Sequence, residues 1–190
     1  MPTLRLSMSE PANDLLSSDP LALLIGMLLD QQVPMEKAFV GPYVLRERLG
    51  HDLDARELAE LPAERVAELF SERPAIHRFP GSMAGRVQAL CKHLVEHYDG
   101  RAEAVWVDAE TGAELVRRLE ALPGFGAAKA RIFLALLGKQ YGVQPEGWRE
   151  AAGGYGDADA HRSVADVVDA DSLSLVREYK RQAKQAAKEG

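Results

Sequence analysis

The sequence has 190 residues, of which 46% are hydrophobic and 27% charged, enough for one hydrophobic core or two small helical lobes that share one. No apolar run reaches the roughly 18 residues of a membrane span, and no signal-peptide pattern begins the sequence. We therefore expect a cytoplasmic protein without a membrane partner. The single cysteine, Cys91, excludes an internal disulfide and a four-cysteine iron–sulfur cluster.

The formal net charge of −6 argues mildly against the nucleic-acid-binding class, because such proteins usually carry a basic face. A few phosphate contacts, however, need only a local basic patch. The clustering of Lys and Arg is therefore more informative than their total.

Helix signals dominate the first part of the chain. We expect residues 1–18 to form an N-terminal arm with an extended start. Asp19 followed by Pro20 is typical of a helix N-cap and first turn, and apolar residues then recur at the spacing of one buried helical face. Pro34 predicts the start of a second helix, and Gly50 predicts its end.

Further capping signals predict several more helices. Asp54 and Pro62 are expected to open two short ones. Ser82 is expected to cap a longer helix that ends at Gly100, and Thr111 to cap another. No segment shows sustained alternation of apolar and polar residues, as a strand would, so the predicted fold class is all-α.

The last third of the chain changes character. Between residues 138 and 156, glycines crowd a loop with room for one helical turn at 148–152. Ser172 is expected to cap a final helix over 173–188, in which Lys and Arg outnumber Glu. The two tryptophans, Trp106 and Trp148, suit either core packing or base stacking, and packing is the commoner role.

Residues 122–130, LPGFGAAKA, predict two helices joined by a tight turn with two glycines. Gly124 and Gly126 allow positive φ and a close approach of the backbone to another surface. Amides at the start of the second helix would then face outward, where a phosphate accepts from them and meets the helix dipole. Lys129 and Arg131 add positive charge, and Phe125 would anchor the turn in the core. The alternative is a structural turn between two core helices.

This segment resembles the hairpin L-P-G-x-G-x-x-x-A of the helix-hairpin-helix (HhH-GPD) DNA glycosylase superfamily, which includes endonuclease-III-like, adenine-mismatch and alkyl-adenine glycosylases. The resemblance implies a compact two-lobed helical domain over 19–169, followed by a basic C-terminal helix over 170–190. It also implies that Gly124, Phe125, Gly126 and Ala127 approach the DNA backbone with Lys129. In the family, turn carbonyls often hold a monovalent cation.

Two further segments resemble the family in the same order along the chain. Gln32, with Gln31 beside it, follows an apolar helix at the position where the family places a glutamine that enters the minor groove and fills the gap left by an extruded base. A polar helix end is the alternative. Residues 82–84 resemble the segment that opens the family's helix before the hairpin.

The resemblance also implies a catalytic carboxylate after the glycine-rich loop. Asp159, Ala160 and His161 reproduce the family's D-x-H pattern, so Asp159 is the candidate, with Asp157 and Asp166 as lesser ones. A fixed negative charge suits the oxocarbenium-like transition state of base release. The preceding loop is longer than in the family, and a solvated turn is the alternative interpretation.

The position at which strand-cleaving members carry a Schiff-base lysine is occupied here by Ala128, so lyase activity is not expected. The leading prediction is a monomeric, monofunctional DNA glycosylase that acts on double-stranded DNA and is nucleoid-associated when bound. It would need no cofactor beyond a possible monovalent cation at the hairpin. The alternative is a non-catalytic DNA-binding protein on the same scaffold, and a weaker one is an interaction module whose hairpin only packs. The basic C-terminal helix suits either DNA contact or solvation.

Overall fold

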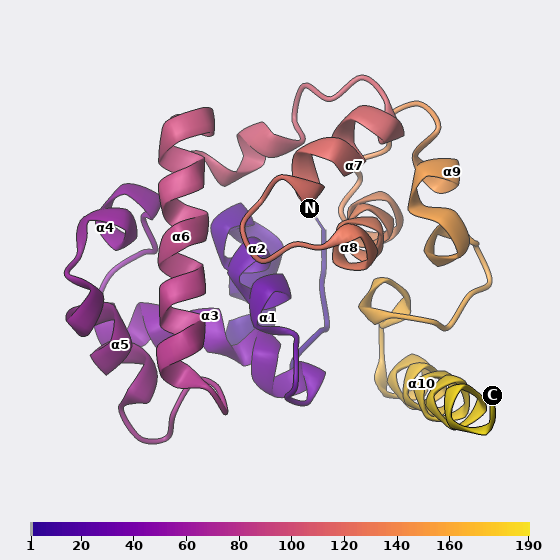
Figure 1. Ribbon diagram of the computed structural model, residues 1–190, viewed down its shortest axis with the longest axis horizontal. Coiled ribbons are helices and arrows are strands. Elements are labelled where there is room, and N and C mark those ends of the chain that lie inside the picture. The colour runs from indigo at the N-terminus through magenta and orange to yellow at the C-terminus, as the bar shows by residue number, and fades with distance from the viewer. Residues whose placement is uncertain (1) are drawn as a thin grey trace.

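The computed structural model describes residues 2–190 and is all-α, with ten α-helices and no strand in that range (Figure 1). None of these helices is, by itself, long and apolar enough to cross a membrane. The helices are α1 (Glu10–Ser18), α2 (Pro20–Leu29), α3 (Met35–Leu49), α4 (Ala55–Glu60), α5 (Ala63–Ser71), α6 (Pro80–Tyr98), α7 (Gly112–Glu120), α8 (Ala127–Gln140), α9 (Trp148–Ala152) and α10 (Ala170–Glu189).

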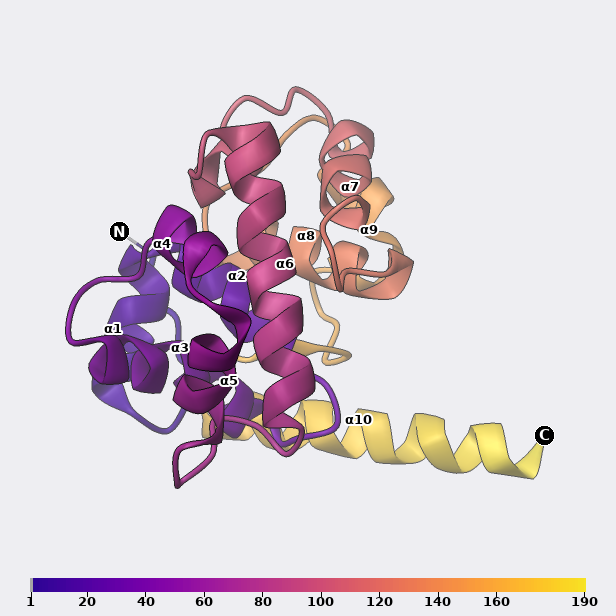
Figure 2. The same cartoon turned by 60° about the vertical axis from the view of Figure 1, so that its left-hand side comes forward.

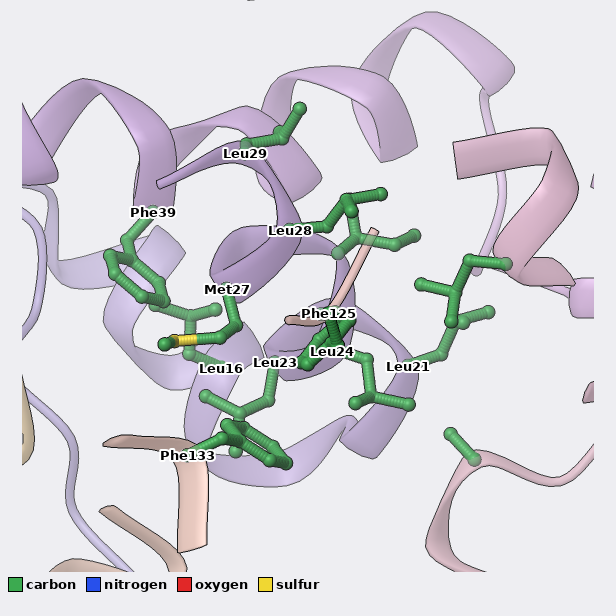
Figure 3. Packing of buried hydrophobic residues seen from close by; sticks show 14 of the residues in the cluster. Leu16, Leu21, Leu23, Leu24, Met27, Leu28, Leu29, Phe39, Phe125 and Phe133 are labelled. Carbon is green, nitrogen blue, oxygen red and sulfur yellow. The ribbon is translucent and has the colours of Figure 1, made fainter. Parts of the chain in front are cut away.

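Helix α2 lies at the centre of the core, and every residue from Leu21 to Leu29 is buried (Figure 3). Its start is the predicted one, because the Asp19 carboxylate accepts hydrogen bonds from the first-turn amides. Gly26 lets α3 approach closely, since a Cβ there would lie 2.6 Å from the ring of Phe39. The apolar spacing that predicted one buried face therefore belongs to a helix buried on all sides.

Two groups of helices pack around α2 (Figure 1). In the first, α6 covers α4 and α5. In the second, α7, α8 and α9 pack together, and the indole of Trp148 occupies the space above Gly138, where a Cβ would lie 2.4 Å from the ring. Trp106 packs edge-on against Phe133. Both tryptophans are buried, so their role is packing and not base stacking.

Three predicted boundaries differ from the structure. The segment expected to be an arm contains α1, and Leu4 and Leu6 ahead of it are buried in the core. Helix α6 begins at Pro80, so Ser82 lies inside it and is not the cap. Helix α10 begins at Ala170, because the Asp169 carboxylate accepts from the Ser172 amide and the Ser172 hydroxyl oxygen accepts from the Asp169 amide, which forms a capping box.

Helix α10 projects beyond the rest of the fold (Figure 2). Its first two turns are held by the buried residues Ser172 and Val176. From Arg177 to Gly190, every residue is exposed.

Candidate nucleic-acid interface

The glycine-rich turn between α7 and α8 is packed against the C-terminal end of α2. Gly124 has a φ of +84°, and a Cβ there would lie 2.3 Å from Cδ1 of Leu28, so both backbone conformation and space require glycine. Phe125 is 5% exposed and packs against Phe133 and the leucines of α2 (Figure 3). The turn therefore exposes its backbone to solvent. The side chain of Phe125 is buried, so it anchors the turn in the core and does not contact DNA.

The other glycine of the turn faces open space. Gly126 is the N-cap of α8, and no atom lies within 4 Å of where its Cβ would be. No side chain caps the amides of this helix end, and Gly126, Ala127 and Ala128 are all exposed. Uncapped amides at the positive end of a 14-residue helix can donate hydrogen bonds to a phosphate oxygen.

Lys129 occupies a different place from the predicted one. Its Nζ donates to the carbonyl oxygens of Met27 at 2.8 Å, Leu28 at 3.3 Å and Asp30 at 3.4 Å. These carbonyls end α2, where the helix dipole favours a cation. Burial lowers the pKa of Lys129, and the nearby Asp30 carboxylate opposes this. Lys129 is thus a helix cap joining α8 to α2, and its amine is engaged by these carbonyls instead of pointing freely to solvent.

The loop that follows α2 is held by a network of side chains. Gln31 donates through Nε2 to the carbonyl of Leu28 at 2.8 Å, and its Oε1 accepts from Arg86 at 2.7 Å. Buried His77 lies within hydrogen-bonding distance of the carbonyls of Gln31 and Leu29 through Nε2, at 2.9 and 3.2 Å. Because the amide of Phe79 donates to Nδ1 of His77, Nε2 carries the proton and donates to these carbonyls. Gln31 is therefore part of the scaffold.

Gln32 is the residue that this network presents to solvent. It is exposed and has a φ of +58°, in the left-handed backbone region that residues other than glycine rarely adopt. Such backbone strain persists only where the surroundings impose it, and it is concentrated at functional sites. Of the two glutamines, Gln31 is engaged by the network and Gln32, the one that the resemblance indicated, is exposed.

Positive side chains gather around this loop despite the acidic total. Arg86 is bonded to Gln31, Lys129 caps the helix before it, and Lys180 of α10 is close enough to Asp30 to lower its pKa. Lys37, Arg73 and Arg78 line a hollow beside His77. A local basic patch, as phosphate binding requires, is therefore present at the end of α2.

Asp159 does not lie in this patch. It is exposed in a turn and lines a hollow of about 900 Å³ together with His161, Arg162 and the α10 residues Tyr179 and Gln182. The other α10 residues of that hollow are Leu175 and Glu178, and all four share one helix face by their spacing.

The opposite face of α10 is directed at the end of α2. Arg177 forms an ion pair with Glu36 at the start of α3, and Lys180 lies near Asp30. Helix α10 thus stands between Asp159 and the loop that carries Gln32. The structure does not bring together the carboxylate and the glutamine that the resemblance placed in one site.

The lesser carboxylate candidates after the loop are also explained by local structure. Asp166 is ion-paired with Lys139 at 2.5 Å, and it accepts from the amides of Arg162 and Ser163 in a capping box. Its side chain is 4% exposed. Asp157 is exposed in the turn, where its carbonyl accepts from the amide of Ala160. Asp157 lines the same hollow as Asp159.

The carboxylate that does lie beside Gln32 is Asp30, which the sequence reading missed. It is half-buried, no hydrogen-bond donor in residues 2–190 reaches its carboxylate, and burial raises its pKa while Lys180 and Lys129 oppose the rise. A carboxylate with these surroundings is a candidate for charge stabilisation or proton transfer. In the sequence, the only indication of a role for Asp30 is its position directly before Gln31 and Gln32.

The remaining predicted positions are simpler. Ala128 and Arg131 are exposed on α8, so Arg131 is available to a phosphate. Within residues 2–190, no group of three or more His, Cys, Asp or Glu side chains is arranged to hold a metal ion. Burial raises the pKa of Cys91 to about 12, which makes this thiol unreactive.

The candidate interface therefore consists of three parts at one end of α2: the uncapped start of α8, the strained Gln32 and the surrounding basic side chains. No known family model matches the sequence, and no curated protein is significantly similar to it.

Proposed function

We propose that this protein binds duplex DNA, with the amides at the start of α8 on a backbone phosphate and Gln32 entering the base stack. The observation that carries the proposal is that an uncapped helix start and a strained, outward glutamine are held at the same helix end. Phosphate contacts position a protein on DNA, and an inserted side chain stabilises an extruded nucleotide.

The rigid connection between the two elements supports this proposal. Lys129 joins α8 to the last carbonyls of α2, and Leu28 fills the space beside Gly124. An inserted side chain resists the restacking of bases only if its support does not move. The network around Gln31 and His77 provides that support.

The sharpest test uses Gly126, because a side chain fits there without strain. Its φ of −82° and ψ of 178° are typical of an N-cap, so Gly126→Asp should cap α8 and retain or raise the melting temperature. The same carboxylate would repel a phosphate. We expect binding to a fluorescent duplex with an abasic-site analogue, measured by anisotropy, to weaken at least about 10-fold.

Gly126→Asn is the matched control, since it caps the helix without charge. It should keep more of the affinity than Gly126→Asp. Equal binding by both variants and the unchanged protein would overturn the proposal.

A glycosylase is the second candidate, and the half-buried carboxylate of Asp30 beside Gln32 favours it. In this reaction the bond between the sugar C1′ and the base nitrogen breaks, the oxygen of water bonds to C1′, and the base leaves with a proton. A carboxylate would stabilise the positive sugar or activate the water. A lyase step through Lys129 is disfavoured, because its amine caps α2.

Duplexes bearing alkylated, oxidised, deaminated and mismatched bases separate the two candidates. Release of free base that Asp30→Asn abolishes and Asp159→Asn leaves intact would assign catalysis to Asp30. The reverse pattern would assign it to Asp159 and to the hollow beside α10. Binding without release by the unchanged protein on every duplex would leave a non-catalytic DNA-binding protein.

A further inference from the structure

The exposed part of α10 carries a single basic stripe. Its five Lys and Arg residues fall within an arc of about 100° on an ideal helix, so they share one face. They are Arg177, Lys180, Arg181, Lys184 and Lys188. The stripe covers about 16 Å of helix, or about five base-pair rises of duplex DNA.

The stripe begins at the candidate interface and leads away from it. Arg177 is paired with Glu36, and Lys180 lies near Asp30, both close to the loop that carries Gln32. The helix then continues beyond the rest of the fold (Figure 2). Its basic residues thus extend the positive surface at the end of α2 in one direction.

Folding does not account for the outer half of α10. From Lys180 onward, each hydrogen bond between side chains stays within the helix, such as Arg181 to Glu178 and Gln185 to Glu189. Lys184 and Lys188 form no ion pair with any residue from 2 to 190. Solvent-exposed charges with no partner add little to stability.

The chemistry of this segment favours a polyanion over a protein partner. Beyond Tyr179, the helix has no apolar side chain larger than alanine, so it lacks the apolar face with which a helix docks into a groove. Residues 177–190 contain five Lys and Arg against two Glu, whereas the whole chain has 23 basic and 29 acidic residues. Positive charge is therefore concentrated where the chain projects.

We propose that the stripe on α10 is a second DNA contact, lying along the phosphates of the duplex that flanks the nucleotide beside Gln32. The inference rests on the proposed function and adds a second electrostatic site, separate from the start of α8. It predicts a footprint longer than the hairpin alone requires and a binding constant strongly dependent on salt.

The experiment compares two double variants that lose the same charge. Lys184→Gln with Lys188→Gln removes the outer end of the stripe, and Arg65→Gln with Lys92→Gln removes two exposed charges from α5 and α6. Binding to a 30-base-pair duplex and to a 10-base-pair duplex with the same abasic-site analogue is measured from low to moderate salt.

We expect the stripe variant to bind the longer duplex about 10-fold more weakly at low salt and to reduce the slope of log K against log salt by about 1 to 2, since each phosphate contact contributes about 0.9. Its binding to the short duplex should change less. The control pair should leave both quantities unchanged, and all variants should keep the melting temperature because the substituted side chains are exposed.

Each other outcome identifies what has failed. If the stripe variant binds like the unchanged protein while Gly126→Asp loses affinity, the stripe is not a DNA contact and the proposed function stands. If the unchanged protein binds neither duplex, both proposals are overturned. If the stripe variant loses binding only to single-stranded RNA or to vesicles with anionic lipid, the stripe serves another polyanion and this inference is wrong.

Discussion

The end of α2 and the turn that carries Asp159 are both polar, surface-exposed regions, yet they are built in opposite ways. At the end of α2, the last carbonyls accept from Lys129, Gln31 and His77, and a strained residue is held in place. Around Asp159, the chain forms an exposed turn with no hydrogen bond to its carboxylate from residues 2–190. Because hydrogen bonds hold the end of α2 rigidly and keep a strained residue in place, this region is the better candidate for a binding site.

Gly124 should give the largest effect. Gly124→Ala combines a positive φ with a Cβ 2.3 Å from Leu28, and we expect a loss of about 2 to 4 kcal/mol in the free energy of unfolding. Urea denaturation measures this. Gly126→Ala in the same turn should cost about 0.5 kcal/mol, and Asp159→Ala should cost no more. Equal costs at the two glycines would remove the distinction between a packed and an open side of the turn.

Substitution of Lys129 should give the second largest loss of stability, because it leaves the C-terminal carbonyls of α2 without their cation. Lys129→Met is expected to cost about 1 to 3 kcal/mol of unfolding free energy, while the salt dependence of DNA binding stays unchanged. Arg131→Met is the control on the same helix, with little effect on stability and a smaller salt slope. A stable Lys129→Met protein with a reduced slope would make Lys129 a phosphate ligand after all.

Substitution of Gln32 should raise the stability of the protein instead of lowering it. Gln32→Gly relieves the strain of a left-handed residue, so the unfolding free energy should rise by up to about 1 kcal/mol while affinity for the abasic duplex falls. Gln31→Ala, which breaks two hydrogen bonds, should instead lower stability. Unchanged affinity in Gln32→Gly would show that the strain serves no binding role.

The smallest expected effect concerns the titration of Asp30. Burial raises its pKa above the usual 3.8, so the charged carboxylate destabilises the folded protein at neutral pH. This cost decreases as pH falls through the raised pKa and disappears below 3.8, where both states are protonated. Asp30→Asn should therefore be more stable than the unchanged protein at pH 7 and equal to it at low pH in thermal melts. A difference that does not depend on pH would place Asp30 in an ordinary solvated environment.

Local signals in the sequence were sufficient where a helix end depends on its neighbours along the chain. The caps at Asp19, Asp54 and Thr111 and the left-handed Gly50 are confirmed. The short turn predicted at 148–152 is α9. Predictions were wrong at Ser82 and at Ser172, where a residue near the start of a helix was taken for its cap.

The candidate site could be predicted only in part. The two-glycine turn and the glutamine pair were visible in the sequence, because spacing and residue type carry those signals. That Lys129 turns toward α2, that Asp30 is half-buried and that Asp159 lies across α10 depend on segments far apart in the chain. No local pattern encodes those distances.

By itself, the sequence determined the all-α class, most helix ends and the position of the turn before α8, because capping and periodicity act over a few residues. Tertiary packing alone decided which polar groups are available. Lys129 caps the end of α2, because α2 ends next to it in the folded protein. Gln32 stays exposed, whereas its neighbour Gln31 is hydrogen-bonded to Arg86. Availability depends on what each side chain meets in space, and only the folded chain sets that.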